Sequence, residues 1–330
     1  MHAGRTSGGD GMTSRTRAHR LPSIPLLAGI PLVAGILMLA ACTGSGASPG
    51  GPAGWNAGGS GGRIVVVTST TVFADLVGQV GGGHVDAVSL IPNGGDVHTF
   101  APRPLDVERI SAARLIVMNV LGLDDWMTRL IADAGAAAPV VRLAEDLPGA
   151  SYVLGENGTP NPHLWLDVAN AEWYVARIAG RLAQVDPAHA DDYAAGAAAY
   201  AGRLRTLDGW IRTRIATIPP DGRRLVSFHD AFPYFARAYG LEIVGTVVAA
   251  PGQEPGAGQV IALIDEIRAA GVKAVFAEAQ FNPAIAEAIA QESGARVVTD
   301  LYNDTLGKAP ADTYEGMMRW DVDRIVGALS

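Results

Sequence analysis

The chain has 330 residues, of which 48% are hydrophobic and 18% are charged, a composition typical of a folded protein with one or two domains. Its 33 acidic residues outnumber the 25 basic ones, so the formal net charge at pH 7 is −8. A nucleic-acid-binding protein needs a basic face for phosphates, and this balance argues against that class.

The first 41 residues have the layout of a secretory signal. Three arginines precede the apolar run "IPLLAGIPLVAGILMLAA", which contains two prolines and is near the lower length limit for a membrane span. The run ends in "LAAC" at Cys42, the only cysteine of the chain. This pattern resembles the bacterial lipoprotein box, in which the cysteine is lipidated. We therefore expect a signal peptide over residues 1–41 and an extracytoplasmic protein anchored to the cell membrane through Cys42.

Residues 42–62 are rich in Gly, Ser and Pro and too poor in apolar side chains to pack, which indicates a flexible tether. Its "GGSGG" precedes a strand instead of following one into a helix, so a phosphate-binding loop is not indicated. Without residues 1–41, the chain has 21 basic and 32 acidic residues, formally −11.

From residue 63 onward, short β-rich runs alternate with segments of helical periodicity. The candidate strands are 63–69, 84–91, 114–119, 138–143, 223–229, 242–248, 273–278 and 295–300. Two groups of four strands predict an α/β fold of two lobes with mostly parallel four-stranded sheets, over residues 63–185 and 219–330. Two of the helical segments end at Gly271 and Gly294, where a glycine cap is expected.

Residues 186–218, between the lobes, predict one long connecting helix. Asp186 and Pro187 form a plausible helix start, and the next proline is Pro219. About 30 helical residues would span about 45 Å, enough to connect the lobes. Three glycines weaken the helix by up to about 1 kcal/mol each. We nevertheless expect one rigid helix instead of a flexible hinge, and therefore small lobe motions.

Three histidines lie where a strand gives way to a loop or a helix. His98 lies in "IPNGGDVHTFAPRP", His163 in "NPHLWLD" and His229 in "FHDAFPYFARAYGL". Asp304, in "LYNDTLG", follows the last candidate strand in the same way. Ligands of open α/β sheets bind beyond the carboxyl ends of the strands, so these four side chains are candidates for one site in the cleft between the lobes.

These four stretches, with "IDEIRAAGVKAVFAEAQFNP" between the last two, resemble the solute-binding lipoproteins of zinc and manganese ABC importers. The resemblance runs in order over residues 63–330, and the lipoprotein box agrees with it. It implies two α/β lobes joined by a long rigid helix, with metal ligands His98 and His163 from the first lobe and His229 and Asp304 from the second. It also implies a permease and its ATPase as partners, and we expect a monomer.

Two positions depart from the family pattern. Many members have proline where this chain has Val97 and Val168, each directly after an aspartate. Neither position supplies a ligand, so we expect only altered loop stiffness.

The donor atoms favour Zn²⁺ as the bound metal. Three imidazoles and one carboxylate suit zinc, whereas Mn²⁺ favours sites richer in oxygen. Manganese-binding members of the family typically have a glutamate at the position of His229. We therefore expect Zn²⁺, with Mn²⁺ or Fe²⁺ as alternatives. Imidazoles bind metal when deprotonated, so we expect affinity to fall as the pH drops through about 6.5.

Two other functions stay open at this point. A zinc-dependent hydrolase needs an open coordination position and a nearby base, for which Glu278 and Asp230 are candidates. We interpret both instead as carboxylates that hold ligating imidazoles, and we expect a protein that is not an enzyme. A surface adhesin-type lipoprotein could use the same fold, although no adhesive module is evident.

The sequence context of four further residues also suggests their roles. Phe228 and Tyr302 flank proposed ligands and are candidates to shield the metal from water. His84 is expected to be a surface or strand-edge residue, and His189, in the first turn of the long helix, is expected to be solvated.

Overall fold

The computed structural model describes residues 62–155, 158–248 and 251–330, all of which belong to one compact unit, Gly54–Ser330. The signal peptide, Cys42 and the tether up to residue 61 lie outside the described residues and stay predictions. None of the helices within the described segments combines the length and the apolar character that crossing a membrane requires.

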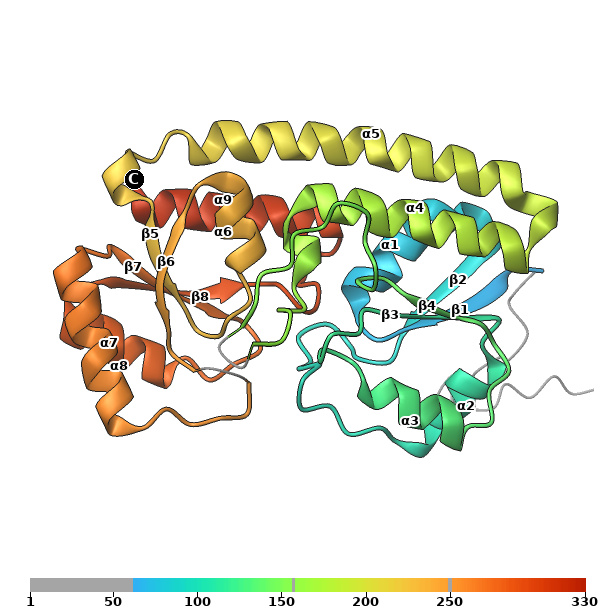
Figure 1. Cartoon of the computed structure of the whole chain (residues 1–330), viewed down its shortest axis with the longest axis horizontal. Helices are drawn as coiled ribbons and strands as arrows, with labels where there is room; N and C mark the ends of the chain where they lie inside the picture. Colours follow the sequence, from blue (N-terminus) through green and yellow to red (C-terminus); the bar gives the residue numbers. More distant parts are fainter. Residues whose placement is uncertain (1–61, 156–157, 249–250) are drawn as a thin grey trace, which may run out of the picture. The chain divides into compact units, whose positions relative to one another are not determined.

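The first lobe contains a parallel sheet with the strand order β2-β1-β3-β4 (Figure 1). Its strands are β1 (Ile64–Thr68), β2 (Val85–Ser89), β3 (Leu115–Met118) and β4 (Val140–Arg142). Its helices are α1 (Thr71–Gly81), α2 (Pro104–Ala112), α3 (Trp126–Asp133) and α4 (Val168–Val185), with short 3-10 turns η1 (Gly82–His84) and η2 (Leu164–Leu166). The central strands β1 and β3 are almost wholly buried, as expected for a parallel sheet covered on both faces.

The second lobe repeats this arrangement in the order β6-β5-β7-β8, again with parallel pairing. Its strands are β5 (Arg224–Ser227), β6 (Glu242–Thr246), β7 (Ala274–Glu278) and β8 (Arg296–Leu301). Its helices are α6 (Pro233–Tyr239), α7 (Ala257–Ala270), α8 (Ala284–Ser293) and α9 (Tyr314–Leu329), after the 3-10 turn η4 (Pro220–Gly222). The predicted fold class is confirmed, and each predicted strand overlaps one of these eight strands.

Glycine ends α7 and α8 as the sequence predicted. Gly271 and Gly294 have φ angles of +64° and +81°, and both are in the left-handed conformation that favours glycine.

A single long helix, α5 (Ala190–Ile215), connects the lobes after the 3-10 turn η3 (Pro187–His189). It packs against α4, α1 and α9, and Figure 1 shows it running alongside α4 and α9. The side chains that it buries recur at spacings that place them on one face. They are Tyr193, Tyr200, Leu204, Leu207, Ile211 and Ile215. The predicted helix is therefore confirmed, although it is shorter than the segment 186–218. The predicted lobe boundaries stay a prediction.

One hydrophobic cluster extends through both lobes. It includes buried apolar side chains from the first lobe, from α5 and from α6 and α9 of the second lobe, whereas a separate cluster within the second lobe contains those of α7 and α8. Tyr314, the first residue of α9, is fully buried and donates its hydroxyl to the carbonyl of Trp165 in the first lobe, at 2.6 Å. Its backbone N–H donates to the carboxylate of Asp75 in α1, at 2.8 Å. A close-packed shared core resists large relative motion of the lobes, because opening it would expose apolar surface.

Gly196 permits the close approach of α5 to α1, and a substitution tests this contact. A Cβ atom at Gly196 would lie 2.5 Å from the backbone oxygen of Val80, whereas one at Gly209 in the same helix would meet nothing within 4 Å. We predict that Gly196→Ala lowers the free energy of unfolding by about 1–3 kcal/mol through overpacking. Gly209→Ala should raise it by up to about 1 kcal/mol through helix propensity. Chemical denaturation of both variants measures this, and equal effects would contradict a close contact.

Candidate metal centre

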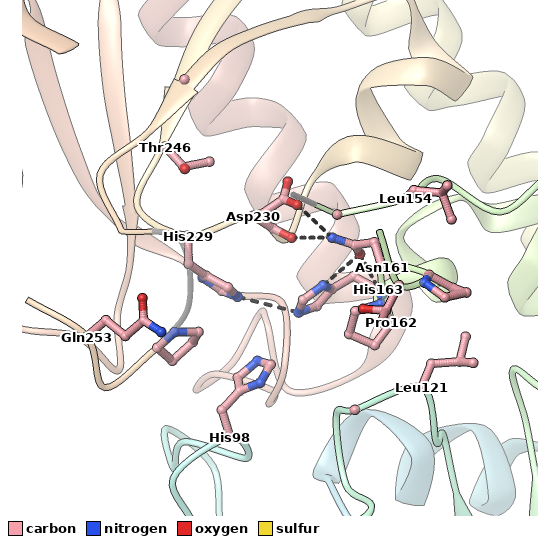
Figure 2. A pocket seen from close by; sticks show the side chains of 16 residues that line it. His98, Leu121, Leu154, Asn161, Pro162, His163, His229, Asp230, Thr246 and Gln253 are labelled. Atoms are coloured by element: carbon pink, nitrogen blue, oxygen red, sulfur yellow. Dashed lines mark hydrogen bonds between the residues drawn. The ribbon is translucent and has the colours of Figure 1, made fainter. Parts of the chain in front are cut away.

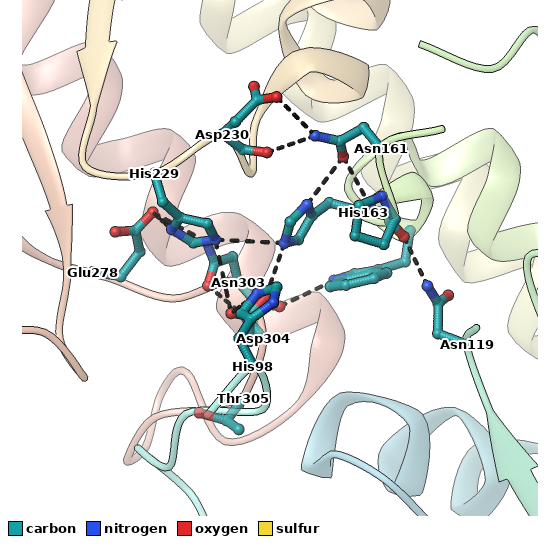
Figure 3. A network of polar contacts seen from close by, with 12 residues as sticks. His98, Asn119, Asn161, His163, His229, Asp230, Glu278, Asn303, Asp304 and Thr305 are labelled. Atoms are coloured by element: carbon teal, nitrogen blue, oxygen red, sulfur yellow. Dashed lines mark hydrogen bonds and ion pairs between the residues drawn. The ribbon is translucent and has the colours of Figure 1, made fainter. Parts of the chain in front are cut away.

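The structure brings the four predicted ligands together. His98, His163, His229 and Asp304 each offer one donor atom, and these atoms lie within 4.8 Å of one another. Nε2 of His98 and Nε2 of His163 each lie 3.3 Å from an oxygen of Asp304, and the Nε2 atoms of His163 and His229 are 3.4 Å apart (Figure 3). Donors about 2.0–2.2 Å from one zinc ion in a tetrahedron are about 3.3–3.6 Å apart. The four side chains therefore have the spacing of a single metal site.

Each of the four follows a strand of the fold. His98 lies in the loop after β2, His163 lies after β4, His229 comes two residues after β5, and Asp304 lies in the loop after β8. The His98 loop is held by Asp96, whose Oδ1 accepts the backbone N–H of His98 at 2.9 Å and whose Oδ2 accepts the hydroxyl of Thr99. Such an Asx turn fixes the backbone locally, and thereby the starting point of the imidazole.

An asparagine orients the imidazole of His163. Oδ1 of Asn161 accepts the backbone N–H of His163 and lies 3.0 Å from its Nδ1, which turns Nε2 toward the other ligands. The amide nitrogen of Asn161 donates to the backbone oxygen of Asp230 at 2.6 Å and to its carboxylate at 3.1 Å (Figure 2). Asp230, interpreted from sequence as a carboxylate that holds a ligating imidazole, thus holds Asn161, the residue that orients His163.

A carboxylate orients the imidazole of His229. Oε1 of Glu278, at the end of β7, lies 3.0 Å from Nδ1 of His229, and both side chains are buried. The same oxygen accepts a hydrogen bond from the amide of Asn303 at 3.1 Å, directly before Asp304. Glu278 therefore contacts the imidazole of one candidate ligand, and it also positions the loop that carries the candidate carboxylate ligand.

The loop of Asp304 is hydrogen-bonded to both lobes. Although it follows β8, the carbonyl of Asn303 accepts the indole N–H of Trp165 at 3.0 Å. On the other side of Asp304, the hydroxyl of Thr305 accepts the backbone N–H of Gly94 at 3.1 Å, and the N–H of Leu306 donates to the hydroxyl of Thr71 at 2.8 Å. The carboxylate is thus held from the first lobe as well as from its own.

Three titratable groups of the site, Asp304, His163 and His229, have strongly shifted pKa values. Burial would raise the pKa of Asp304, but hydrogen bonds from His163 and His98 hold it well below its ordinary value. Burial lowers the pKa of His163 to about 4, against the raising effect of Asp304. Burial would also lower the pKa of His229, but Glu278 and Asp304 outweigh it and raise this pKa to about 9. At neutral pH, His163 is therefore neutral and His229 carries the proton that a metal would displace.

A cavity of about 510 Å³ leads to the three histidines. His98, His163 and His229 line one part of it, and Leu121 and Gln253 are among the side chains of its wall (Figure 2). The side chain of His98 is 15% exposed, whereas those of the other three candidate ligands are at most 3% exposed. His98 is therefore the candidate ligand that an ion arriving from solvent can meet first.

The sequence pointed to the wrong aromatic neighbours. The ring of Phe281 meets His229 edge-on at 5.3 Å, and Phe228 stacks on Phe281 at 5.0 Å instead of facing the imidazole. Among the described residues, the ring contact of Tyr302 is with Trp320 and not with a candidate ligand. Phe281, Asn161, Asn303 and Trp165 were missed as contributors. Of these four, only Asn161 could have been suspected from the sequence, because it precedes the candidate ligand His163 by two positions.

A strained turn supports the loop of His163. Val120 and Leu121 have φ angles of 72° and 57°, which are unusual for side chains other than glycine, and the β-branched Val120 is an outlier. Asp124 holds this turn because its two oxygens accept the backbone N–H groups of Asn119 and Val120, each at 2.7 Å. The amide of Asn119 in turn donates to the carbonyl of Pro162, directly before His163, at 2.8 Å. Burial raises the pKa of Asp124 to about 6, so its carboxylate is ionised above that pH.

We predict that Asp124→Asn destabilises the protein and weakens metal binding. An amide has one accepting oxygen, so one of the two backbone N–H groups would face an NH₂ group, at a cost of about 1–3 kcal/mol. Metal affinity should fall by up to about tenfold, because Asn119 would hold Pro162 less firmly. Asp125→Asn is the matched control, since Asp125 is exposed and its carboxylate accepts the N–H of Gly122 in the neighbouring turn. Urea unfolding and metal titration of both variants measure the difference, and equal affinities would contradict the link.

Comparisons with known proteins agree with this geometry. A family model described as zinc-uptake complex component A, periplasmic, matches residues 66–328. The manganese-binding lipoprotein MntA of Halalkalibacterium halodurans is 31% identical over 269 residues, which cover 81% of this chain and 89% of MntA. The iron-binding protein YfeA of Yersinia pestis is 31% identical over 80% of this chain and 85% of YfeA. The solved structure of the periplasmic zinc binding protein TroA from Treponema pallidum has a TM-score of 0.76 at 29% identity, covering 82% of this chain and 100% of TroA.

Proposed function

The chain belongs to the zinc-uptake complex component A family, and from this premise we propose that it captures Zn²⁺ outside the cytoplasm as the metal-binding component of an ABC importer. The metal is cargo, which the protein delivers to a permease. The single observation that carries the proposal is the convergence of three imidazoles and one carboxylate on one buried point. Two of the imidazoles are already turned toward it by Asn161 and Glu278.

Donor chemistry supports zinc over the other candidate metals. The relatives are named for manganese, iron and zinc, so family membership leaves the metal open. Zinc accepts a tetrahedral set of nitrogen and carboxylate donors, and it exceeds manganese and iron in the affinity series for nitrogen sites. With His229 the site has three nitrogen donors and one carboxylate. We therefore propose Zn²⁺ as the main cargo, with Mn²⁺ and Fe²⁺ as weaker ligands.

The partners and the location follow from the same proposal. Capture outside the cytoplasm requires a permease and its ATPase to move the ion inward. Lipidation of Cys42 would keep the protein at the membrane surface near that permease, with the Gly-rich segment 42–62 as its tether. We propose that the protein acts as a monomer, since the four candidate ligands all come from one chain.

A zinc-dependent hydrolase is the main rival. It needs an open coordination position for water and a free base. Four donors complete a tetrahedral zinc site, and the two candidate bases have other contacts: Glu278 with His229 and Asn303, and Asp230 with Asn161. A zinc-bound crystal structure with an ordered water on the ion beside Glu278 would favour the hydrolase.

Substitution of His229 tests the ligand set. We predict that His229→Ala lowers zinc affinity by at least about a hundredfold, because three donors replace four and the charge of Glu278 is left buried and unpaired. Equilibrium dialysis with metal analysis measures this, with thermal unfolding as the control for folding. Full, tight binding of one equivalent of zinc by the variant would contradict the four-ligand model.

An oxygen donor at the same position should change the metal preference. We predict that His229→Glu, combined with Glu278→Gln, lowers the ratio of zinc affinity to manganese affinity by at least about tenfold. The second substitution is needed because Glu278 lies beside Nδ1 of His229 and would repel a new carboxylate. Glu278→Gln alone is the control. Competition titrations with both metals measure the ratio, and an unchanged ratio would argue against donor type as the basis of selectivity.

Metal binding should release a proton from His229. Because the pKa of this imidazole is raised to about 9, it is protonated below that pH in the metal-free protein, and the metal must displace the proton. We therefore predict that zinc affinity falls about tenfold per pH unit below about 9, well above the window near 6.5 that the sequence suggested. Calorimetric titration at pH 7.5 in buffers of different ionisation enthalpy should show release of about one proton per zinc ion.

A carboxylate substitution separates this effect from general acid sensitivity. Glu278→Gln removes the charge that favours protonated His229, so fewer protons should be released at pH 7.5. Glu287→Gln, an exposed change on α8, should behave as the unmodified protein does. Equal proton release from all three proteins, or none from the unmodified one, would contradict the assignment.

A further inference from the structure

Two histidines outside the metal centre lie against each other on the surface of the first lobe. The rings of His84 and His189 are stacked, with centroids 3.9 Å apart and planes 23° from parallel. His84 ends η1, before β2, and His189 ends η3, before α5. From sequence His84 was expected to be a surface or strand-edge residue and His189 to be solvated, and the structure places their rings in contact. His84 precedes β2, whereas His98 follows it. The pair therefore lies at the amino ends of the strands, and the metal centre lies beyond their carboxyl ends.

Each of these imidazoles has one ring nitrogen held by a carboxylate. Nδ1 of His189 lies 2.7 Å from Oδ2 of Asp186, and Nε2 of His84 lies 3.1 Å from Oδ2 of Asp192. The other nitrogen of each ring has no hydrogen bond to any described residue. A carboxylate on one nitrogen, with the other nitrogen left as a donor, is the arrangement in which imidazoles bind metals. Glu278 and His229 show the same arrangement in the metal centre.

The surroundings favour a cation. Asp186, Asp191 and Asp192 lie within seven residues around the start of α5, and the guanidinium of Arg114 donates to the backbone carbonyl of Val185, directly before Asp186. Hydrogen bonds from Tyr193 and His189 hold the pKa of Asp186 below its ordinary value, so this carboxylate stays charged. The three carboxylates therefore make the surroundings of the two rings acidic.

We propose that His84 and His189 form a second, surface site for a divalent transition-metal ion such as Zn²⁺ or Ni²⁺. Nε2 of His189 and Nδ1 of His84 supply the nitrogen donors, while Asp186 and Asp192 hold the opposite nitrogen of each ring. The stacked rings must turn relative to each other for both nitrogens to face one ion. The side chains of His84 and Asp192 are 36% and 63% exposed, so they are free to turn, whereas Asp186 anchors His189. Binding here is weaker than between the lobes, because exposed side chains lose rotamer freedom when they are ordered.

Metal stoichiometry of the purified full chain tests this site. The unmodified chain should bind two equivalents of Zn²⁺, one tightly and one more weakly, and Ni²⁺ should also occupy the weaker site. Replacing both histidines, as His84→Gln with His189→Gln, should abolish the second equivalent and leave the first, which also shows that the variant is folded. His229→Ala should weaken the first, tight equivalent and leave the second in place. The two variants therefore distinguish failure of this site from failure of the interlobe site.

A pair of neighbouring aspartates provides a finer control. Asp192→Asn should weaken the second equivalent by at least about tenfold, whereas Asp191→Asn, an exposed change one residue earlier with no imidazole contact, should leave it nearly unchanged. The imidazole resonances of His84 and His189 should shift only as the second equivalent is added. One equivalent in the unmodified chain, or a second equivalent that survives loss of both histidines, would overturn the proposal.

Discussion

The site depends on one buried negative charge. The carboxylate of Asp304 is completely buried, and it faces imidazole nitrogens at 3.3 Å instead of backbone N–H groups. Removing an ionised carboxylate from water costs several kcal/mol unless opposite charge compensates it. The three histidines around Asp304 bring positive charge to it in two ways: when one of them is protonated, or when they bind a metal ion together with Asp304. The loop of Asp304 is accordingly fixed by hydrogen bonds from both lobes, which hold the charge where three imidazoles meet.

The architecture around this charge favours a site that is largely formed before metal arrives. The helix α5 and a hydrophobic core shared by both lobes oppose a wide opening of the cleft, because separation would expose apolar surface. Capture therefore needs a local route. His98, the most exposed of the four candidate ligands, lies in a loop held by Asp96 and by the contact between Gly94 and Thr305. Motion of this loop can admit an ion without disturbing the core.

The parts of this structure that the sequence revealed are those with a local signature. Eight β-rich runs marked the strands, an uninterrupted helical stretch marked α5, and each candidate ligand stood just beyond a strand, where parallel sheets collect ligands. Contacts between distant residues had no such signature. Asp230 is adjacent to His229 in sequence, but it accepts hydrogen bonds from Asn161, 69 residues away. His84 and His189 each had a plain surface interpretation, and only folding brings them together.

Charge balance connects the two carboxylates of the centre with a divalent cargo. Asp304 and Glu278 contribute two negative charges to a region with almost no access to water, since both are at most 1% exposed. In the metal-free protein, protonated His229 offsets one of them. When a divalent ion replaces that proton, the ion and the two carboxylates sum to zero. A monovalent ion in place of the proton would leave the net charge of the region unchanged, so it would bring no electrostatic gain. Because the site is buried, its two carboxylates favour a divalent over a monovalent ion. Among divalent ions, the three imidazole nitrogens favour those that prefer nitrogen donors.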